Sequence, residues 1–413
     1  MTLIQLADVL LPVFGPLSAI LLVASILIAF LVAAFLFETV AAVALPNKTT
    51  APQRGRTPRG RIGVLVPAHN EEEGLARTIA KIQPQLGRDD RLLVVADNCT
   101  DGTAALANRL GAEVIVRTDS KDKGKGFALD YGVRHFAKGD PPKIVIIVDA
   151  DCVVGDSAMD NLAQVCGETN RPVQALYLME AAPGSTPPAR IREFAWRVRN
   201  RIRPLGLNSA GLPCQLMGTG MAFPWEIIAN ASLATGELAE DLKLGLELAA
   251  NGRPPVFCPT AIVSSEFPAT REGSQTQQLR WEQGHLGLIT REIPKLLVKA
   301  LRCGNLELLA LTIDAAIPPL SFLFVITTCL FAMGLLLRDM SPIGRTIFTI
   351  NAGSLIGYTC AAVLCWLSVG RDLIPMRSAL LIPISIFLKI PFYFRILLRK
   401  NGRSWVRTDR RRM

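Results

Sequence analysis

The chain has 413 residues, of which 50% are hydrophobic, and a formal net charge of +10. With a mean hydropathy of +0.32, it is too apolar for an ordinary soluble protein, yet its middle is too polar for a pure bundle of membrane helices. The positive charge fits contact with anionic lipid headgroups and phosphorylated substrates. Because no groove-reading motif occurs, nucleic acid is not expected as a partner. The nine cysteines form no Cys-x-x-Cys pair, which indicates a reducing compartment without structural zinc.

Apolar segments near both ends of the chain predict membrane helices. Between residues 13 and 45 the only ionisable side chain is Glu38, and this segment is long enough to span a bilayer with tilt. It lacks a basic start and a cleavage-site pattern, so we expect a retained helix rather than a signal peptide. Further spans are predicted near 317–337 and 347–369. The segment 379–398 is apolar but interrupted by prolines and basic residues, so it spans, re-enters or lies along the interface.

Basic residues beside the apolar segments predict how the chain crosses the membrane. They place both ends of the central region and the C-terminus in the cytoplasm. With the second and third spans forming a hairpin, this favours an interfacial or re-entrant segment at 379–398 over a true fourth span. The basic groups are Arg54, Arg56, Arg59 and Arg61, then Arg291, Lys295, Lys299 and Arg302, and finally the tail from Arg399 to Arg412.

These observations divide the chain into six predicted parts. The central part is long enough to bury a core of its own. The parts are an N-terminal membrane helix (1–46), a basic, proline-rich linker (47–61), a cytoplasmic α/β domain (62–272), interfacial amphipathic helices (273–303), a membrane hairpin (304–370), and an interfacial or membrane segment with a basic tail (371–413).

In the central part, strand-like apolar runs alternate with helical stretches, which is typical of a mostly parallel α/β sheet. A first strand at 62–66 is expected to stop at Pro67, and a helix at 71–82 to follow with Asn70 as its N-cap. Further strands are predicted at 92–96, 114–116, 144–148 and 173–178, and further helices at 103–110, 126–136, 189–203 and 274–288, with another that Asp241 opens.

The run 144–148 is purely apolar and β-branched, as in a strand buried on both faces, and it is followed at once by Asp149 and Asp151. Polar clusters also follow the first two strands, at 67–71 and 97–102. The carboxyl ends of parallel strands meet at one edge of a sheet, so these clusters predict a single site. Two neighbouring acids there suggest a divalent ion that carries a phosphorylated ligand. The alternative is a pair of solvated turn acids.

Seven motifs, in this order along the chain, resemble the membrane-bound family 2 glycosyltransferases, which include hyaluronan, chitin-oligosaccharide and cellulose synthases and ceramide glucosyltransferase. The resemblance covers about 61–288 and the flanking spans. It implies a GT-A-type fold, a mostly parallel sheet with helices on both faces, inserted between membrane helices. One departure is Ala96, where the family often has an acid. The motifs are Val64–Glu71, Val95–Asp101, Lys123–Gly126, Asp149–Asp151, Gly218–Gly220, Glu240–Asp241 and Gln277–Trp281, the last being the most discriminating.

The resemblance also implies roles for the matched residues. Asp97 would accept hydrogen bonds from a uracil or ribose, and Asp149 and Asp151 would hold Mg²⁺ or Mn²⁺ against the diphosphate. Asp241 would be the general base that deprotonates the acceptor hydroxyl, with Glu240 in support. The other residues expected to bind donor or acceptor are Pro67, Asn70, Glu71, Lys125, Gly218, Thr219, Gly220, Gln277, Arg280 and Trp281.

Each of these roles has a structural alternative. Lys125 could be a solvated loop lysine instead of a phosphate contact. Asp241 could only cap its helix. Arg280 and Trp281 could anchor a helix at the membrane surface instead of gripping a diphosphate and stacking on a sugar. His69 and His285 have no ligand-spaced partner and are expected to be structural.

The predicted activity is an inverting, metal-dependent transfer of a hexose or N-acetylhexosamine from a UDP-sugar, forming a β linkage. The acceptor would be a polysaccharide or a lipid-linked saccharide, in exopolysaccharide or glycolipid synthesis at a bacterial inner (plasma) membrane. Export or polymerisation partners could assist. The alternatives are a ceramide-type lipid glucosyltransferase and a catalytically silent subunit that only binds sugar nucleotide within an export assembly.

Overall fold

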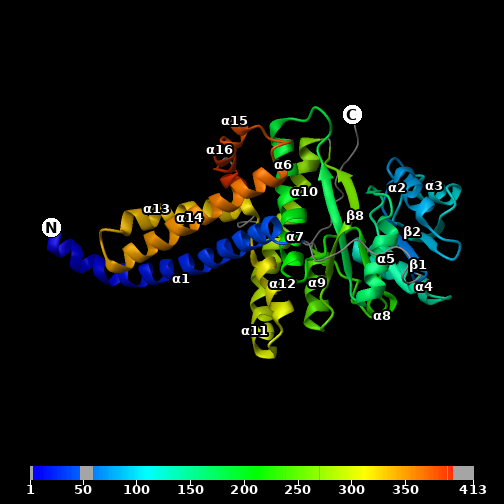
Figure 1. The fold of residues 1–413 in the computed structure, drawn as a ribbon, viewed down its shortest axis with the longest axis horizontal. Coiled ribbons are helices and arrows are strands. Elements are labelled where there is room, and N and C mark those ends of the chain that lie inside the picture. Colours follow the sequence, from blue (N-terminus) through cyan, green and yellow to red (C-terminus); the bar gives the residue numbers. More distant parts are fainter. Residues whose placement is uncertain (1–2, 47–58, 238, 269, 388, 394–413) are drawn as a thin grey trace.

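The computed structural model describes residues 3–46, 59–237, 239–268, 270–387 and 389–393. The molecule is elongated, with long helices α1, α13 and α14 side by side at one end and the β-sheet at the other (Figure 1). The predicted basic groups at Arg54 and Arg56 and in the tail from Arg399 to Arg412 lie outside the described residues.

The described strands form one eight-stranded sheet in the order β3-β2-β1-β4-β7-β6-β8-β5. Strands β3, β2, β1 and β4 are parallel, β7 runs antiparallel to both β4 and β6, β8 is parallel to β6, and β5 is antiparallel to β8. This confirms the predicted α/β class with a mostly parallel half. The strands are β1 (Ile62–Ala68), β2 (Arg91–Asp97), β3 (Glu113–Arg117), β4 (Ile144–Ile147), β5 (Val153–Val154), β6 (Val173–Glu180), β7 (Met221–Pro224) and β8 (Val256–Glu266).

Helices cover both faces of the sheet, because successive side chains of its central strands point to opposite sides. Val64 and Ile146 enter one core with α2, α3 and α5, whereas Leu65 and Ile147 enter another with α4, α8 and α9. This is why the runs in β1 and β4 are apolar at every position. The helices are α2 (Leu75–Ile82), α3 (Thr103–Arg109), α4 (Lys125–Ala137), α5 (Ala158–Thr169), α8 (Trp225–Ile228) and α9 (Glu240–Ala250), with a 3₁₀ turn η1 (Gln83–Gln85) after α2.

Two predicted boundaries in this region are wrong. Strand β1 runs through Pro67. The amide of Val148 donates to Leu65 O, so the backbone N–H and C=O groups of odd-numbered residues in β1 point toward β4. Strand β4 ends before it reaches the level of Pro67. The missing N–H of Pro67 therefore costs no hydrogen bond between the two strands. Helix α2 begins at Leu75 and not at residue 71, because Asn70 takes a left-handed conformation (φ 55°) and its side chain bonds the neighbouring loop instead of capping a helix.

Among the described residues, four segments are long and apolar enough to cross a membrane: Pro16–Ala44, Leu320–Leu337, Pro342–Val369 and Met376–Tyr393. The first three follow the helices α1 (Leu3–Ala44), α13 (Leu320–Leu337) and α14 (Pro342–Val369), which pack together around buried Phe35 and Tyr358. The fourth is folded as two short helices, α15 (Met376–Ala379) and α16 (Ile382–Phe387).

The fourth segment lies against the domain-facing end of α13, beside α6 and α10 (Figure 1). The hydroxyls of Ser321 and Tyr393 are 2.5 Å apart, and the rings of Phe324 and Phe387 have centroids 5.7 Å apart. Ser321 and Phe324 belong to the first turns of α13. The segment therefore does not run the length of the bundle, and the interfacial arrangement stays our preferred interpretation.

Helices between the sheet and the bundle join the two halves of the molecule. The predicted helix at 189–203 begins earlier as α6 and continues without a break through a π-helical turn η2 into α7. Helix α10 extends the predicted stretch 274–288 at both ends. These joining helices are α6 (Pro187–Arg197), η2 (Val198–Ile202), α7 (Arg203–Ser209), α10 (Arg271–Arg291), α11 (Ile293–Cys303) and α12 (Leu306–Ala316).

A buried ion triad sits where these helices meet α1. Arg203 Nε donates to Glu38 Oε2 (2.7 Å), and Arg203 Nη2 donates to Asp314 Oδ1 (2.5 Å) and to Asp314 O (2.8 Å). All three side chains are at most 7% exposed. The single acid of the first apolar segment thus has its partner in the central domain, which the sequence did not reveal.

Candidate active site

A cavity of about 260 Å³ opens where β1, β2 and β4 end, and it is closed on the far side by α9, α10 and η2. This is the edge of the sheet at which the sequence placed the polar clusters. Twelve residues of the predicted site line this one cavity, and they come from segments spread over more than half of the chain. They are Pro67, Glu71, Asp97, Lys125, Asp149, Asp151, Gly218, Glu240, Asp241, Gln277, Arg280 and Trp281.

Three residues of the predicted site do not line the cavity and act as supports. Asn70 Oδ1 accepts from the amide and hydroxyl of Thr100, which ties together the loops after β1 and β2. Thr219 is fully buried, and its hydroxyl accepts from the amide of Asp149 (3.0 Å). Gly220 bonds the sheet through its amide and carbonyl. These three residues do not reach the cavity because their polar groups bond within the sheet and its loops.

The end of β4 brings together the donors of a candidate metal centre. Among the described residues, Asp149, Asp151 and Cys152 offer ligand atoms within 4.8 Å of one another. The two carboxylates suit a hard cation such as Mg²⁺ or Mn²⁺. Burial raises the pKa of the Cys152 thiol, which keeps it protonated and a poor ligand. The donor set thus fits an oxygen-binding ion held by the two acids.

Lys125 points into the same corner rather than into solvent. Its ammonium pairs with the Asp149 carboxylate and donates to Gly218 O (2.6 Å). Burial opposes the charged form, but the carboxylates of Asp149 and Glu240 outweigh it and the pKa of Lys125 is raised. The lysine therefore stays charged beside the acids, where it would meet a phosphate group. The solvated-loop alternative does not hold.

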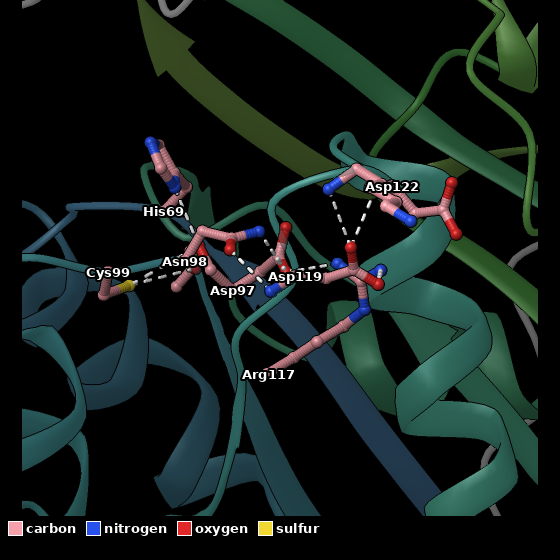
Figure 2. Close-up of polar contacts among 9 residues, drawn as sticks. His69, Asp97, Asn98, Cys99, Arg117, Asp119 and Asp122 are labelled. Atoms are coloured by element: carbon pink, nitrogen blue, oxygen red, sulfur yellow. Dashed lines mark hydrogen bonds and ion pairs between the residues drawn. The ribbon is translucent and has the colours of Figure 1, made fainter.

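Asp97 is held in a fixed orientation at the end of β2. Figure 2 shows it between Asn98 and Arg117: the Asn98 amide (3.0 Å) and the Arg117 guanidinium (2.8 Å) both donate to Oδ1. His69 Nδ1 donates to the carbonyl of Asp97 (2.7 Å). The Asp119 amide donates to Asn98 Oδ1, which fixes the loop after β3. The network leaves the carboxylate facing the cavity with its charge partly balanced by Arg117.

Glu240 and Asp241 form the first turn of α9, and both residues are half-buried at the cavity. Burial and the neighbouring charge of Asp241 raise the pKa of Glu240 to about 7, and burial also raises the pKa of Asp241. The amide of Leu242 donates to Asp241 Oδ1 (2.9 Å), so the expected capping contact is present. Asp241 Oδ2 lies 3.3 Å from where a Cβ would stand on Gly218. Asp241 therefore both begins its helix and faces the cavity.

An aromatic and basic wall from α10 and α6 faces these acids. Trp281 packs against Trp196 with ring centroids 4.9 Å apart, and Trp196 meets the edge of Tyr177 at 5.4 Å. Burial lowers the pKa of Arg280, while the charges of Glu240 and Asp149 oppose that shift. Arg280 and Trp281 line the cavity, so the alternative of anchors at the membrane surface does not describe them.

Sequence reasoning missed several lining residues. His69 was expected to be structural, and Tyr177, Trp196 and Arg199 were not singled out. Arg199 and Trp196 lie within an arginine-rich run whose pattern predicts only a basic helix, and no residue in it signals the π-helical turn η2 on which Arg199 lies. His285 instead lies in a neighbouring small cavity, where its Nε2 donates to Ala315 O and burial lowers its pKa to about 3.

Comparison with known proteins identifies the family. Residues 58–284, more than half of the chain, match the family model described as "Glycosyltransferase like family 2". The chain is a family 2 glycosyltransferase. This confirms the predicted enzyme class, and the matched residues include the cavity acids and the α10 motif.

Relatives of this glycosyltransferase share its class. An uncharacterized glycosyltransferase of Mycobacterium tuberculosis is 30% identical over 193 residues, covering 43% of this chain and 82% of the relative. The probable glycosyltransferase YdaM of Bacillus subtilis is 26% identical over 249 residues, covering 54% and 55% of the two chains. A mannosyltransferase from Pyrobaculum calidifontis, solved with GDP-Man and Mn²⁺, has a TM-score of 0.50 at 18% identity, covering 83% of this chain and 98% of that one. That likeness supports the fold.

Proposed function

We propose that this glycosyltransferase is an inverting, divalent-metal-dependent membrane enzyme. It moves a hexose or N-acetylhexosamine from a UDP-sugar to a polysaccharide or lipid-linked acceptor and forms a β linkage. The observation that carries the proposal is the single cavity that holds Asp149, Asp151, Asp241, Arg280 and Trp281. Metal ligands, base and sugar platform must lie within one cleft for a one-step displacement.

The donor occupies the sheet side of the cavity in this proposal. Asp97 receives hydrogen bonds from the base or ribose, and Lys125 contacts a phosphate as a point charge. Asp149 and Asp151 hold Mg²⁺ or Mn²⁺. When bound, the ion offsets the charge that builds up on the departing diphosphate. The P. calidifontis enzyme, which was solved with Mn²⁺, is consistent with this choice of ion.

The acceptor enters from the side of α9 and α10. Asp241 takes the proton of the acceptor hydroxyl, and its raised pKa makes it a stronger base than an exposed aspartate. Glu240, its neighbour, supports it. Arg280 grips the diphosphate, because its guanidinium lies near Asp149 and Glu240. Trp281 stacks on the acceptor sugar. Gly218, at φ 90°, leaves room beside Asp241 for the reacting hydroxyl.

The proposal is tested by nucleoside diphosphate release from the purified full-length protein in lipid nanodiscs. UDP-glucose and UDP-N-acetylglucosamine are supplied with Mn²⁺, and GDP-mannose serves as a third arm because the P. calidifontis structure contains that donor. We expect release from a UDP-sugar that EDTA abolishes and Mn²⁺ restores. Release from GDP-mannose alone would contradict the UDP assignment, and no release from any donor with any acceptor would contradict the activity.

Two alternatives are separated by the product. A catalytically silent subunit would bind donor without releasing diphosphate, and it would have no need of the carboxylates of Glu240 and Asp241 that line the cavity. A ceramide-type glucosyltransferase would give a lipid-extractable product. Membranes incubated with labelled sugar nucleotide should therefore be extracted with organic solvent, because polymer stays behind and glycolipid does not.

We also propose a cytoplasmic catalytic domain on a bacterial inner membrane. Arg59 and Arg61 after the first span, and Arg291 and Lys295 before the second, support this orientation by the positive-inside rule. Accessibility of an introduced cysteine near residue 139 to a membrane-impermeant reagent in intact cells tests it. We expect labelling only after the cells are opened. Labelling in intact cells would place the domain outside.

A further inference from the structure

A half-buried cation that lines the cavity, Arg199, has no protein partner among the described residues. Arg199 lies on η2, below the outer surface and open to the cavity, and it also lines a smaller cavity beside Arg203 and Asp314. Within the part of the chain that the structure describes, its guanidinium makes no hydrogen bond or ion pair. Because its surroundings disfavour the charged form and no partner compensates for this, its retention there calls for a ligand. π-Helical turns such as η2 often occur at functional sites.

A second unsatisfied donor lines the same cavity. Gln277 in α10 is 2% exposed, and its Nε2 has no hydrogen-bond partner among the described residues. Buried polar groups in proteins are nearly always hydrogen-bonded, so such an amide marks a place for a ligand atom. Arg199 and Gln277 can both only donate through these atoms. The group that satisfies them must be an acceptor and, opposite a guanidinium, an anion.

The position of Arg199 separates it from the donor diphosphate. The charges that act most strongly on Arg280 are those of Glu240, in the first turn of α9, and of Asp149, at the metal-binding edge of the sheet. The carboxylates that act on Arg199 are instead those of Asp241, Asp314 and Glu282. Of the two arginines, Arg280 is therefore the one near the metal-binding acid Asp149, whereas Arg199 lies near the base Asp241 and near Asp314 of the helices next to α1. The nearby Arg203 pairs with both Glu38 and Asp314, whereas Arg199 has no such pair among the described residues and is open to a ligand.

We propose that Arg199 and Gln277 bind a phosphate group of the acceptor, beside the hydroxyl that Asp241 deprotonates. The inference deepens the proposed function and rests on it for the place of the acceptor. A guanidinium fork matches the geometry of phosphate oxygens. The neighbouring rings of Trp196 and Trp281, tilted 38° to each other, line the same cavity and give the acceptor an apolar contact. The phosphate can belong to a lipid-linked acceptor or to a soluble sugar phosphate.

The test measures binding and needs no turnover. Purified full-length protein in detergent is titrated with radiolabelled farnesyl phosphate in a scintillation proximity assay. We expect Arg199→Gln to weaken this binding by about 10-fold or more, because it removes a charge-assisted contact. Farnesol, which lacks the phosphate, should compete poorly. Equal binding by Arg199→Gln and the unaltered protein, or equal competition by farnesol, would overturn the proposal.

Competition also distinguishes the source of the phosphate. If glucose 1-phosphate displaces the label poorly, the subsite recognises a phosphate that comes on a lipid. If it displaces the label as well as unlabelled farnesyl phosphate does, the subsite recognises a phosphate without a lipid, and the acceptor is a soluble sugar phosphate. Both results support the phosphate subsite and assign its ligand.

Two further variants guard against misleading results. Arg201→Gln removes the same charge from the same turn at an exposed position, so its affinity should match that of the unaltered protein. Gln277→Glu keeps the size of the side chain and places a carboxylate in the cavity, which should repel the phosphate and weaken binding even if Arg199→Gln fails to fold. Loss of binding in Arg201→Gln to the same extent as in Arg199→Gln would show nonspecific attraction and refute the subsite.

The two proposals can fail separately. If the protein releases no nucleoside diphosphate but binds farnesyl phosphate through Arg199, the anion subsite stands and the transfer reaction does not. If it releases diphosphate normally while Arg199→Gln binds farnesyl phosphate unchanged, the reaction stands and the subsite does not. In the second case the role of Arg199 is to set the charge of Asp241.

Discussion

The triad at the base of α1 and the acids of the cavity are both groups of buried charge, but they are balanced differently. In the triad, Arg203 donates to both Glu38 and Asp314, so every charge has a close partner. In the cavity, Lys125 pairs with Asp149, whereas Glu240 and Asp241 form no ion pair with any described residue. A saturated group holds helices together, and an unsaturated one is available to a ligand.

The largest expected effect separates chemistry from structure within the cavity. Asp241→Asn keeps the size of the side chain and removes the base, so transfer should fall by about 10²- to 10⁴-fold, the usual contribution of a general base. The melting temperature should not fall, because a buried carboxylate has been neutralised. Diphosphate release at fixed donor and metal concentrations gives the rate. Activity within a few-fold of the unaltered enzyme would mean that Asp241 only begins its helix.

The triad should respond in the opposite way. Arg203→Met leaves Glu38 and Asp314 buried without a cation, and removal of one partner from a buried ion group typically costs about 3–5 kcal/mol. We expect a clear fall in melting temperature or in the yield of folded protein. As a matched control, replacing Glu38, Arg203 and Asp314 together by apolar residues should restore much of the stability. An Arg203→Met protein as stable as the original would contradict the structural role.

A smaller effect should appear in the dependence of stability on pH. Glu240 has a pKa of about 7 in the folded protein against an ordinary value of 4.5, so folding favours its protonated form. Its contribution to stability is therefore complete below pH 4.5 and is lost as the pH rises to about 7. Glu240→Gln should raise the melting temperature at pH 8, with a gain of about 1–3 kcal/mol, and leave it nearly unchanged at pH 4.5. An equal shift at both pH values would refute the assignment.

The smallest effect on stability is expected for an exposed ion pair, which serves as a reference for the effects at buried charges. Arg134 is 72% exposed and pairs with Asp130 one helical turn away at 2.7 Å. Because solvent screens such pairs, Arg134→Gln should change stability by about 0.5 kcal/mol or less. A melting curve that overlays the original is the expected result. A loss comparable to that of Arg203→Met would mean that burial does not govern these effects.

The sequence predicted much of the fold because the central strands have a strong local pattern. The apolar runs of β1 and β4 are buried on both faces, and the acids that follow β4 lie at the sheet edge where such residues were expected. The family motifs then brought in Glu240, Asp241 and the α10 residues, which lie far along the chain. Local pattern alone could not have joined these segments, because their contact depends on tertiary packing.

What the sequence did not predict depends on contacts between distant helices. The pairing of Glu38 with Arg203 joins residues from a membrane helix and the central domain, and no periodicity in either segment signals it. The π-helical turn that carries Arg199 likewise has no signal in the local sequence. Asn70 is a residue type that favours the N-cap of a helix, but its side chain instead accepts a hydrogen bond from Thr100 in the loop after β2.

The close crossing of α1 and α7 has a consequence for biosynthesis. A Cβ on Gly206 would stand 1.9 Å from Glu38 O, so the two backbones touch and a larger residue would force them apart. Glu38 leaves the ribosome first, Arg203 follows, and Asp314 arrives only after the entire sheet has been made. During synthesis Arg203 can therefore pair only with Glu38 until α12, which carries Asp314, has left the ribosome. An excised 62–272 fragment would keep that arginine without either acid, and we expect it to accumulate as insoluble protein.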